Sequence, residues 1–426
     1  VQVMDVASTK RMLDRISPSF CIAKWARTNV RTYEGTSYSC HHCRPIVTPK
    51  EDVINDHTAL TNNEKVKQYR QQMLDGERPR ECNYCWTRED QGLTSDRILK
   101  SRKFITEHKI NPFTVAEKLT HDPVHLDIAF DRTCNFKCSY CGPQNSSLWA
   151  EEIAQHGDIE GLPSFISRDP IPNREVNPYN DAFWSWWDSG LKYSLKHLTI
   201  TGGEPLLSKE FWKVLDKVEE ENLDMTILVN TNLCPPKKLF TKFMKRVKDF
   251  SQINISTSIE STSERAEYSR YGLDYKQFLK NMDTILSETE MNVYINLTNN
   301  ALSFTSLTDM VKELTELKVK YGAKRIVLHS NDVNYPRYLN LTILPKTLRI
   351  EQVSKFKKFM KTRKHYFSDM EKYKFQRTLE LSLIDHPEKD IYRDQFFKFI
   401  KEYDKRRDLN FSKTFPEIAN VWKINE

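Results

Sequence analysis

Residues 124–141 read VHLDIAFDRTCNFKCSYC, an apolar run followed closely by a group of cysteines. The run 124–130 has the β-branched character of a strand. Cys134, Cys138 and Cys141 follow it at spacings of four and three, so their thiolates can converge on one metal centre and leave a coordination position open. Soft thiolates suit zinc or iron–sulfur centres. A structural zinc would need a fourth protein ligand nearby, whereas an iron–sulfur cluster with one free iron can bind another molecule there.

The chain around this loop repeats one pattern from about residue 124 to 330: a short β-branched run, a turn and a longer helical stretch. The predicted strands are 124–130, 196–201, 224–230, 251–258, 292–298 and 324–329. Strands that alternate with helices favour parallel pairing through right-handed crossovers. We therefore predict an α/β fold, a partial (β/α)6 TIM-like barrel, with its chemistry at the carboxyl ends of the strands.

A second motif, Thr201-Gly202-Gly203-Glu204-Pro205, follows the predicted strand 196–201 directly. Glycines let a backbone approach a ligand closely, and a carboxylate or exposed carbonyls can accept hydrogen bonds from an ammonium group. This motif would lie at the same edge of the sheet as the cysteine loop.

The two motifs together resemble the signature of the radical S-adenosylmethionine (SAM) superfamily, in which an aromatic residue, here Tyr140, precedes the last cysteine and a GGE motif ends a strand. The resemblance covers about half of the chain. It implies that Cys134, Cys138 and Cys141 hold a [4Fe–4S] cluster whose fourth iron binds SAM. One-electron reduction then cleaves SAM into methionine and a 5′-deoxyadenosyl radical. The resemblance also implies an electron donor such as flavodoxin or ferredoxin.

Polar side chains at the other strand ends are candidates for SAM binding. Ser256, Ser258 and Glu260 resemble the family's ribose-binding position, and Arg270 on the helix that follows could supply a guanidinium for the SAM carboxylate. Asn230 ends the predicted strand 224–230. Arg265 and Tyr268 lie on the same predicted helix as Arg270 and are candidates beside it, whereas Asn230, Asn232, Asn296 and Thr298 are candidates of lower rank. Each of these side chains could instead cap a helix.

The amino-terminal cysteines form a separate group. Cys40-His-His-Cys43 and Cys82-Asn-Tyr-Cys85 make a CxxC…CxxC pattern, for which a zinc ribbon is one interpretation. Cys21, Gly35 and Cys40 also resemble the C…GxxxxC opening of the SPASM and twitch extensions, which carry an auxiliary iron–sulfur cluster. That resemblance favours an auxiliary [4Fe–4S] cluster. The implied ligands are Cys21, Cys40, Cys82 and Cys85, with Cys43 as a fifth candidate. Such extensions usually follow the barrel, but here the pattern precedes it.

His41 and His42 are expected at the surface beside this site rather than as ligands. Cys234, alone after the predicted strand 224–230, is expected to be a small buried apolar residue. In the long connection 142–195, Trp184 and Trp187 have helical spacing and are expected to pack in the core.

Three regions follow from these patterns: a cysteine-rich region 1–115, a barrel 116–345 and helices 346–426 that pack on it. The last region holds 20 basic and 13 acidic residues, which accounts for the whole net charge of +7. A basic tail could contact nucleic acid, but a solvated helix face is the simpler interpretation. No apolar run is long enough to span a membrane, and the start of the sequence lacks the pattern of a signal peptide, so we expect a cytoplasmic protein.

The sequence therefore predicts an enzyme that abstracts hydrogen from a substrate by radical chemistry. A peptide or protein side chain is favoured as the substrate, because auxiliary-cluster extensions often accompany peptide modification. A nucleotide, RNA or small metabolite is the alternative. A hypothesis of another class is a non-catalytic scaffold or nucleic-acid binder that holds zinc at both cysteine groups. No residue is assigned to catalysis beyond those that hold cofactors.

Overall fold

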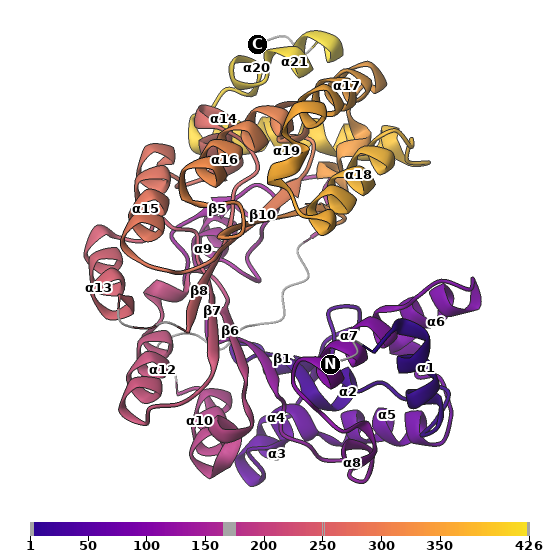
Figure 1. The fold of residues 1–426 in the computed structure, drawn as a ribbon. Coiled ribbons are helices and arrows are strands. Elements are labelled where there is room, and N and C mark those ends of the chain that lie inside the picture. Colours follow the sequence, from indigo (N-terminus) through magenta and orange to yellow (C-terminus); the bar gives the residue numbers. More distant parts are fainter. Residues whose placement is uncertain (1–3, 165–175, 249, 251, 424–426) are drawn as a thin grey trace. The chain divides into compact units, whose positions relative to one another are not determined.

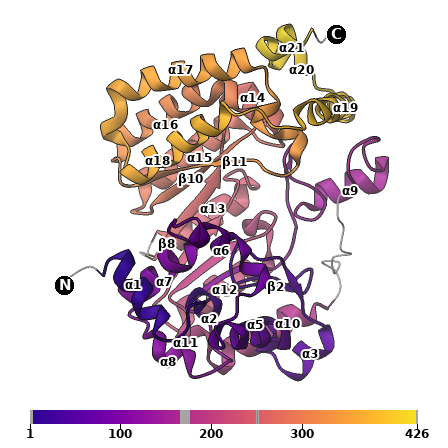
Figure 2. The same ribbon diagram turned by 90° about the vertical axis from the view of Figure 1, so that its right-hand side faces the viewer.

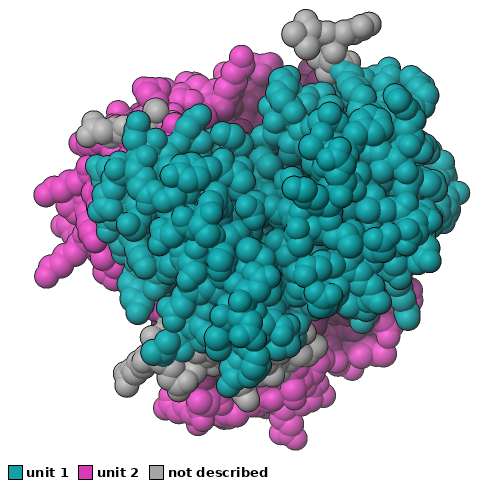
Figure 3. Space-filling model, turned by 90° about the horizontal axis from the view of Figure 1, so that it is seen from below, with its two compact units in different colours: residues 1–131, 168–202, 208–228 teal, residues 132–167, 203–207, 229–426 magenta. Residues whose placement is uncertain are grey.

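The computed structural model describes residues 4–164, 176–248, 250 and 252–423. Its contacts divide the chain into two compact units, which Figure 3 distinguishes by colour. Unit 1 comprises residues 1–131, 168–202 and 208–228, and unit 2 comprises residues 132–167, 203–207 and 229–426.

Unit 1 begins with an arrangement of short helices and strands (Figure 1). Its amino-terminal helices are α1 (Val6–Asp14), α2 (Ala23–Ala26), α3 (Lys50–Asn55), α4 (Ala59–Asn62), α5 (Glu64–Leu74), α6 (Asn83–Asp90), α7 (Asp96–Thr106) and α8 (Pro112–Ala116). Its later helices are α10 (Pro178–Trp186), α11 (Lys192–Ser194) and α12 (Lys209–Glu220). Its strands are β1 (Arg27–Arg31), β2 (Thr36–Tyr38), β3 (Ile46–Val47), β4 (His125–Ala129) and β6 (His197–Thr201).

The strands of unit 1 have the order β6-β4-β1-β2-β3. β4 pairs parallel with β6, as the alternating pattern predicts. β1 pairs parallel with the other edge of β4, from Arg27 opposite His125 to Arg31 opposite Ala129. The sequence pattern does not predict β1, because RTNVR is too polar to be recognised as a strand. The cysteine-rich region is thus continuous with the sheet that carries β4.

Two apolar clusters support unit 1. One gathers around Trp25, which is 1% exposed and packs on Phe20 with ring centroids 4.9 Å apart. The other contains Trp184 and Trp187, which pack against Phe183 in α10. Trp187 is fully buried, which confirms that these two tryptophans belong to the core.

Unit 2 contains parallel strands with helices between them. The strands are β8 (Ile253–Ser258), β10 (Val293–Asn299) and β11 (Ile326–Asp332), and β10 pairs parallel with both others. The helices are α9 (Ser147–His156), α13 (Lys237–Val247), α14 (Ser263–Ser269), α15 (Tyr275–Glu288) and α16 (Leu307–Tyr321). A short antiparallel pair, β5 (Lys137–Cys138) and β9 (Arg270–Tyr271), stands apart from these strands. β7 (Thr226–Asn230) contains the division between the two units.

The carboxyl-terminal helices of unit 2 are α17 (Lys346–Arg363), α18 (Asp369–Ser382), α19 (Lys389–Arg407), α20 (Phe411–Thr414) and α21 (Pro416–Trp422), shown from another side in Figure 2. α18 packs on β11, where Glu371 accepts a hydrogen bond from the Leu328 N–H at 2.9 Å and pairs with the buried Lys318. The packing of the whole region 346–426 on a barrel stays a prediction. No described helix has the length and apolar character that a membrane span would need.

Strands occur at all six predicted places, and the pairings β4–β6, β8–β10 and β10–β11 are parallel. The predicted α/β class is therefore confirmed, whereas closure into a barrel stays a prediction. The long connection contains α9, α10 and α11. Its prolines Pro170 and Pro172, and position 251 of one predicted strand, lie outside the described residues.

Candidate cofactor and metal sites

The loop that carries Cys134, Cys138 and Cys141 is held in place by its own backbone and by the start of α9. Ser146 caps α9 and donates from its hydroxyl to the Phe136 carbonyl at 2.7 Å. The Trp149 indole donates to the Cys138 carbonyl at 2.9 Å. The Cys134 N–H donates to the Ser147 hydroxyl at 3.1 Å. Because the loop is anchored on both sides of Cys138, the positions of its thiols are set by the fold.

Burial raises the pKa of all three thiols, that of Cys141 to about 12. Thiolates at such sites form when a metal replaces the proton. Among the described residues, the groups whose metal-ligating atoms converge within 4.8 Å do not include these cysteines. A single tetrahedral zinc, with Zn–S bonds of about 2.3 Å, needs sulfurs closer together than that. The three sulfurs are therefore not all as close to one another as the ligands of a single tetrahedral ion.

Cys138 lies opposite Arg270 in the β5–β9 pair. Arg270 donates to the Tyr140 hydroxyl, and its Nη1 is 3.6 Å from Oε2 of Glu260. Glu260 is 1% exposed and Arg270 6%. Glu260 is thus ion-paired with Arg270 and lies next to the Tyr140 hydroxyl, but neither of its oxygens, nor Nε of Arg270, makes a close hydrogen bond to a described residue. Buried unpaired polar groups cost about 1–3 kcal/mol each, so the site is suited to a polar ligand that would satisfy them.

The glycines of the GGEP motif make close backbone contacts. A Cβ on Gly203 would lie 2.2 Å from the Thr133 carbonyl oxygen, in the segment that leads into the cysteine loop. Gly202 has a φ of +123°, and a Cβ there would lie 2.5 Å from the Asp131 carbonyl oxygen. Both positions therefore require glycine, because a larger residue would displace the backbone next to the loop.

Glu204 of the same motif is buried and accepts three hydrogen bonds. The donors are the Thr231 hydroxyl at 2.7 Å, the Asn232 N–H at 2.6 Å and the Leu206 N–H at 3.1 Å. Burial raises the pKa of Glu204 to about 7 despite these donors. The carboxylate thus ties the motif to the end of β7, and contact of this motif with SAM stays a prediction.

The other predicted SAM contacts are distributed along the strand ends. Ser256, in β8, accepts a hydrogen bond from the Asn296 amide at 3.0 Å, while Ser258 ends β8 and Asn230 ends β7. Arg265 forms a bidentate ion pair with Glu417 at 2.7 and 2.8 Å. Its guanidinium is therefore engaged by α21, so Arg270 is the arginine available beside the cysteine loop.

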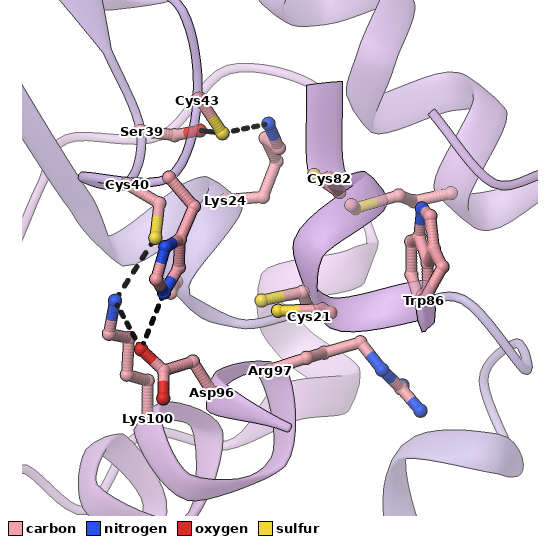
Figure 4. A pocket seen from close by; sticks show the side chains of 14 residues that line it. Cys21, Lys24, Ser39, Cys40, Cys43, Cys82, Trp86, Asp96, Arg97 and Lys100 are labelled. Carbon is pink, nitrogen blue, oxygen red and sulfur yellow. Dashed lines mark hydrogen bonds and ion pairs between the residues drawn. The ribbon is translucent and has the colours of Figure 1, made fainter. Parts of the chain in front are cut away.

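All five amino-terminal cysteines line one pocket of unit 1 (Figure 4). They are Cys21, Cys40, Cys43, Cys82 and Cys85. They come from segments up to 64 residues apart in sequence, which the fold of α2, α6 and the turn after β2 brings together. The pocket thus gathers the residues that the resemblance implies, together with Cys43.

Within the pocket, the residues that could hold a metal form smaller groups. The ligand atoms of Cys43, Glu81 and Cys82 lie within 4.8 Å of one another, as do those of Cys40, His41 and His42. His42 is 2.8 Å from Asp96. Burial, with Lys100 and His42 close by, lowers the pKa of His41 to about 4, so its imidazole is neutral at pH 7. His41 is exposed and His42 half-buried, and the expectation that they flank the site rather than bind the metal stays a prediction.

The pocket also holds cations that the sequence analysis missed. Lys100 Nζ lies 3.0 Å from Cys40 Sγ, and Lys24 Nζ lies 3.9 Å from Cys43 Sγ (Figure 4). Lys24 is 3% exposed and also pairs with Glu81. Positive charge close to sulfur stabilises thiolates. The signal in the sequence is weak: Lys24 follows Cys21 by three residues, and Lys100 lies one helical turn after Asp96.

Cys234 is 9% exposed, and its Sγ lies 3.4 Å from the Asp274 carbonyl oxygen. Its prediction as a small buried residue is confirmed.

No protein-family model matches the chain. A GTP 3′,8-cyclase of Aliarcobacter butzleri is 23% identical over 140 residues, which are 33% of this chain and 35% of the relative. An S-adenosylmethionine-dependent nucleotide dehydratase of a Fibrobacter species is 22% identical over 196 residues, which are 44% of this chain and 50% of the relative. The matched segments thus span a third to a half of these relatives.

Among solved structures, SuiB of Streptococcus suis bound to S-adenosylmethionine gives a TM-score of 0.39 at 13% identity, covering 82% of this chain and 70% of that one. The sequence relatives, taken with the cysteine loop and the GGEP motif, relate this chain to the radical SAM enzymes and thereby to a SAM-binding [4Fe–4S] cluster.

Proposed function

We propose that this chain cleaves SAM at a [4Fe–4S] cluster held by Cys134, Cys138 and Cys141 and abstracts hydrogen from a substrate. The observation that carries the proposal is the pairing of Cys138 with Arg270, next to the buried carboxylate of Glu260, which has Arg270 as its ion-pair partner and room for closer hydrogen bonds. A ligand with charged amino and carboxylate groups and hydroxyls would satisfy these atoms.

Each residue has a role in this proposal. The three cysteines hold the cluster, which with SAM supplies a 5′-deoxyadenosyl radical. Arg270 provides positive charge for a carboxylate, while Glu260 accepts hydrogen bonds. Ser256, Ser258 and Asn230 offer further polar groups at the strand ends. Burial of the loop restricts water around the thiols.

For the amino-terminal pocket we propose an auxiliary [4Fe–4S] cluster of the SPASM or twitch kind, within a region 1–115 that precedes the barrel region 116–345 and the helical region 346–426. Support comes from the five cysteines in one pocket and the cations Lys24 and Lys100 beside them. A zinc ion is the second candidate, because the CxxC…CxxC pattern is typical of zinc sites and the ligand atoms of Cys43, Glu81 and Cys82 lie close together.

Two substrate classes are open to test. The auxiliary-cluster resemblance supports a peptide or protein side chain. The names of the sequence relatives, a GTP 3′,8-cyclase and a nucleotide dehydratase, support a nucleotide. With either substrate class, the proposed reaction needs an electron donor such as flavodoxin or ferredoxin to reduce the cluster.

The test is anaerobic reconstitution followed by iron and sulfide counting and by assay of 5′-deoxyadenosine under dithionite. Two clusters would give about eight irons per chain, and one cluster about four. Addition of nucleoside triphosphates or of peptides should then raise the rate of 5′-deoxyadenosine release for the correct substrate class only. Colourless, zinc-replete protein with no cleavage under any condition would contradict the proposal.

A further inference from the structure

The helices α17 and α18 enclose a groove of about 510 Å³ that none of the cofactor sites uses. This volume is in the range of roughly 300–1,000 Å³ that is typical of ligand sites. The groove residues on α17 and just after it are Val353, Phe356, Lys357, Met360, Lys361 and Lys364. Those on α18 and just after it are Lys372, Phe375, Gln376, Leu379, Glu380 and Leu383.

Each set has the three- and four-residue spacing of a single helix face. The apolar members form the floor, where Phe356 of α17 meets Phe375 of α18 with ring centroids 5.0 Å apart. Leu383 at the margin is 38% exposed. From Val353 to Lys364 the groove face covers about three helical turns, or about 16 Å. It is thus an elongated apolar groove between two helices.

The rim of the groove is basic. Residues 346–382 hold 11 Lys+Arg and 4 Asp+Glu, a surplus that equals the net charge of +7 of the whole chain. Lys357, Lys361 and Lys364 are exposed, and no acidic residue of the described part of the chain lies within ion-pair distance of them. The positive charge of this rim is therefore available to a partner.

Charge is unevenly distributed along the groove. A connection of only five residues joins α17 to α18, so the two helices run antiparallel (Figure 2). Lys361, Lys364 and Lys372 therefore gather at the end near this connection, while Glu380 lies toward the other end, hydrogen-bonded to Gln376 at 2.8 Å. An occupant would place its acidic residues toward the connected end.

An amphipathic helix satisfies both properties of the groove, since apolar residues at i, i+3, i+4 and i+7 can enter a floor of this length while acidic residues flank them. The accessible apolar surface of the groove comes from aliphatic side chains such as Met360 and Leu383, because Phe356 and Phe375 beneath them are only 1% and 2% exposed. Apolar side chains of a peptide helix can pack on this surface, whereas the bases of a nucleic acid would find no exposed aromatic ring on which to stack.

We propose that the groove between α17 and α18 binds an acidic amphipathic helical segment of a partner polypeptide. The proposal is independent of the radical SAM function, because it rests on residues outside both cysteine sites. If the substrate is a polypeptide, the groove provides a docking site for a part of it that lies away from the reacting residue.

The test uses the full-length reconstituted protein and a display library of random 16-residue peptides. Selection on the wild type, with counter-selection on Lys361→Glu/Lys364→Glu, should enrich acidic sequences with apolar residues at helical spacing. A synthetic enriched peptide carrying fluorescein should bind saturably, with affinity that falls as NaCl rises from 50 to 300 mM.

The matched control is Lys358→Glu/Arg363→Glu, which changes the net charge equally at exposed positions of α17 outside the groove. The groove variant should weaken binding at least tenfold, and the control less than threefold. Met360→Glu should weaken it as strongly by blocking the apolar floor. Equal losses in the two double variants, enrichment of no common pattern, or equal binding of a scrambled peptide would overturn the proposal. So would a chain that dimerises through this groove, or single-stranded RNA that binds it in preference to the peptide.

Discussion

Cys138 and Arg270 face each other across a two-residue antiparallel pair, which places a buried guanidinium beside the central cysteine of the loop. The same guanidinium contacts Tyr140 and Glu260. This arrangement makes the loop sensitive to the charge balance of a few buried groups.

Arg270→Gln should lower the free energy of unfolding of the metal-free protein by about 3–5 kcal/mol, because the buried Glu260 carboxylate would lose its ion-pair partner. Urea denaturation measures the loss. The double variant Arg270→Gln/Glu260→Gln should recover most of it without recovering SAM cleavage. If the double variant is as unstable as Arg270→Gln alone, the loss of stability does not come from an unpaired charge on Glu260.

Replacement of Cys134, Cys138 or Cys141 by Ala should remove about four irons per chain and abolish 5′-deoxyadenosine release. Cys234→Ala is the matched control, because Cys234 is as buried as Cys138 and its thiol contacts the Asp274 carbonyl rather than another cysteine of the loop. Iron content that falls equally in the control would show a general failure to fold rather than loss of a ligand.

Gly203→Ala should destabilise the protein by about 1–3 kcal/mol and reduce reconstituted iron, because its Cβ would press on the Thr133 carbonyl. Gly157→Ala, at a positive φ but with no atom within 4 Å of its Cβ, should cost about 1 kcal/mol and leave iron unchanged. Thermal unfolding and iron assays on both variants separate the two effects.

In the amino-terminal pocket, single Ala replacements at Cys21, Cys40, Cys82 and Cys85 should each remove the auxiliary metal. Cys43→Ala should retain it, because the resemblance to the SPASM and twitch extensions implies the other four cysteines as the ligands. Metal analysis of the five variants decides the ligand set. Loss in Cys43→Ala with retention in Cys21→Ala would instead assign Cys43 as a ligand.

His197 should make unit 1 less stable at acid pH. Burial, together with His125 and His108 nearby, lowers the pKa of His197 from 6.5 to about 4. Below pH 6.5 the unfolded chain therefore binds a proton that the folded one does not, and stability falls until about pH 4. The loss should be about 1–2 kcal/mol, because solvent screens part of the effect.

Denaturant unfolding at pH 7.5 and 4.5 tests this expectation. His197→Gln should show a smaller difference between the two pH values than the wild type, while His365→Gln, an exposed substitution, should match the wild type. If His197→Gln and the wild type lose the same free energy of unfolding between pH 7.5 and 4.5, groups other than His197 cause the acid sensitivity.

Much of the fold follows from local patterns. The six strands and the cysteine loop could be predicted, because alternation and cysteine spacing are properties of short segments. Local patterns could not predict that Arg265 is engaged elsewhere while Arg270 lies beside the cysteine loop. Arg265 pairs with Glu417, which is 152 residues away in the sequence. The sequence also could not predict that Glu204 ties its motif to a neighbouring strand end, because its hydrogen-bond partners Thr231 and Asn232 follow another strand. The polar strand β1 is defined by its neighbour β4 rather than by its own sequence.

The pairing of β1 with β4 also determines how this chain can be divided. Removal of the residues before the first predicted strand would leave one edge of β4 without its hydrogen-bonding partner, and exposed edges of this kind promote aggregation. The cysteine-rich region is therefore not a module that can be cut away or exchanged between relatives. A shortened protein for structural work should keep at least residues 27–31. If the whole cysteine-rich region is removed, a change in activity would reflect damage to the sheet as well as loss of a cofactor.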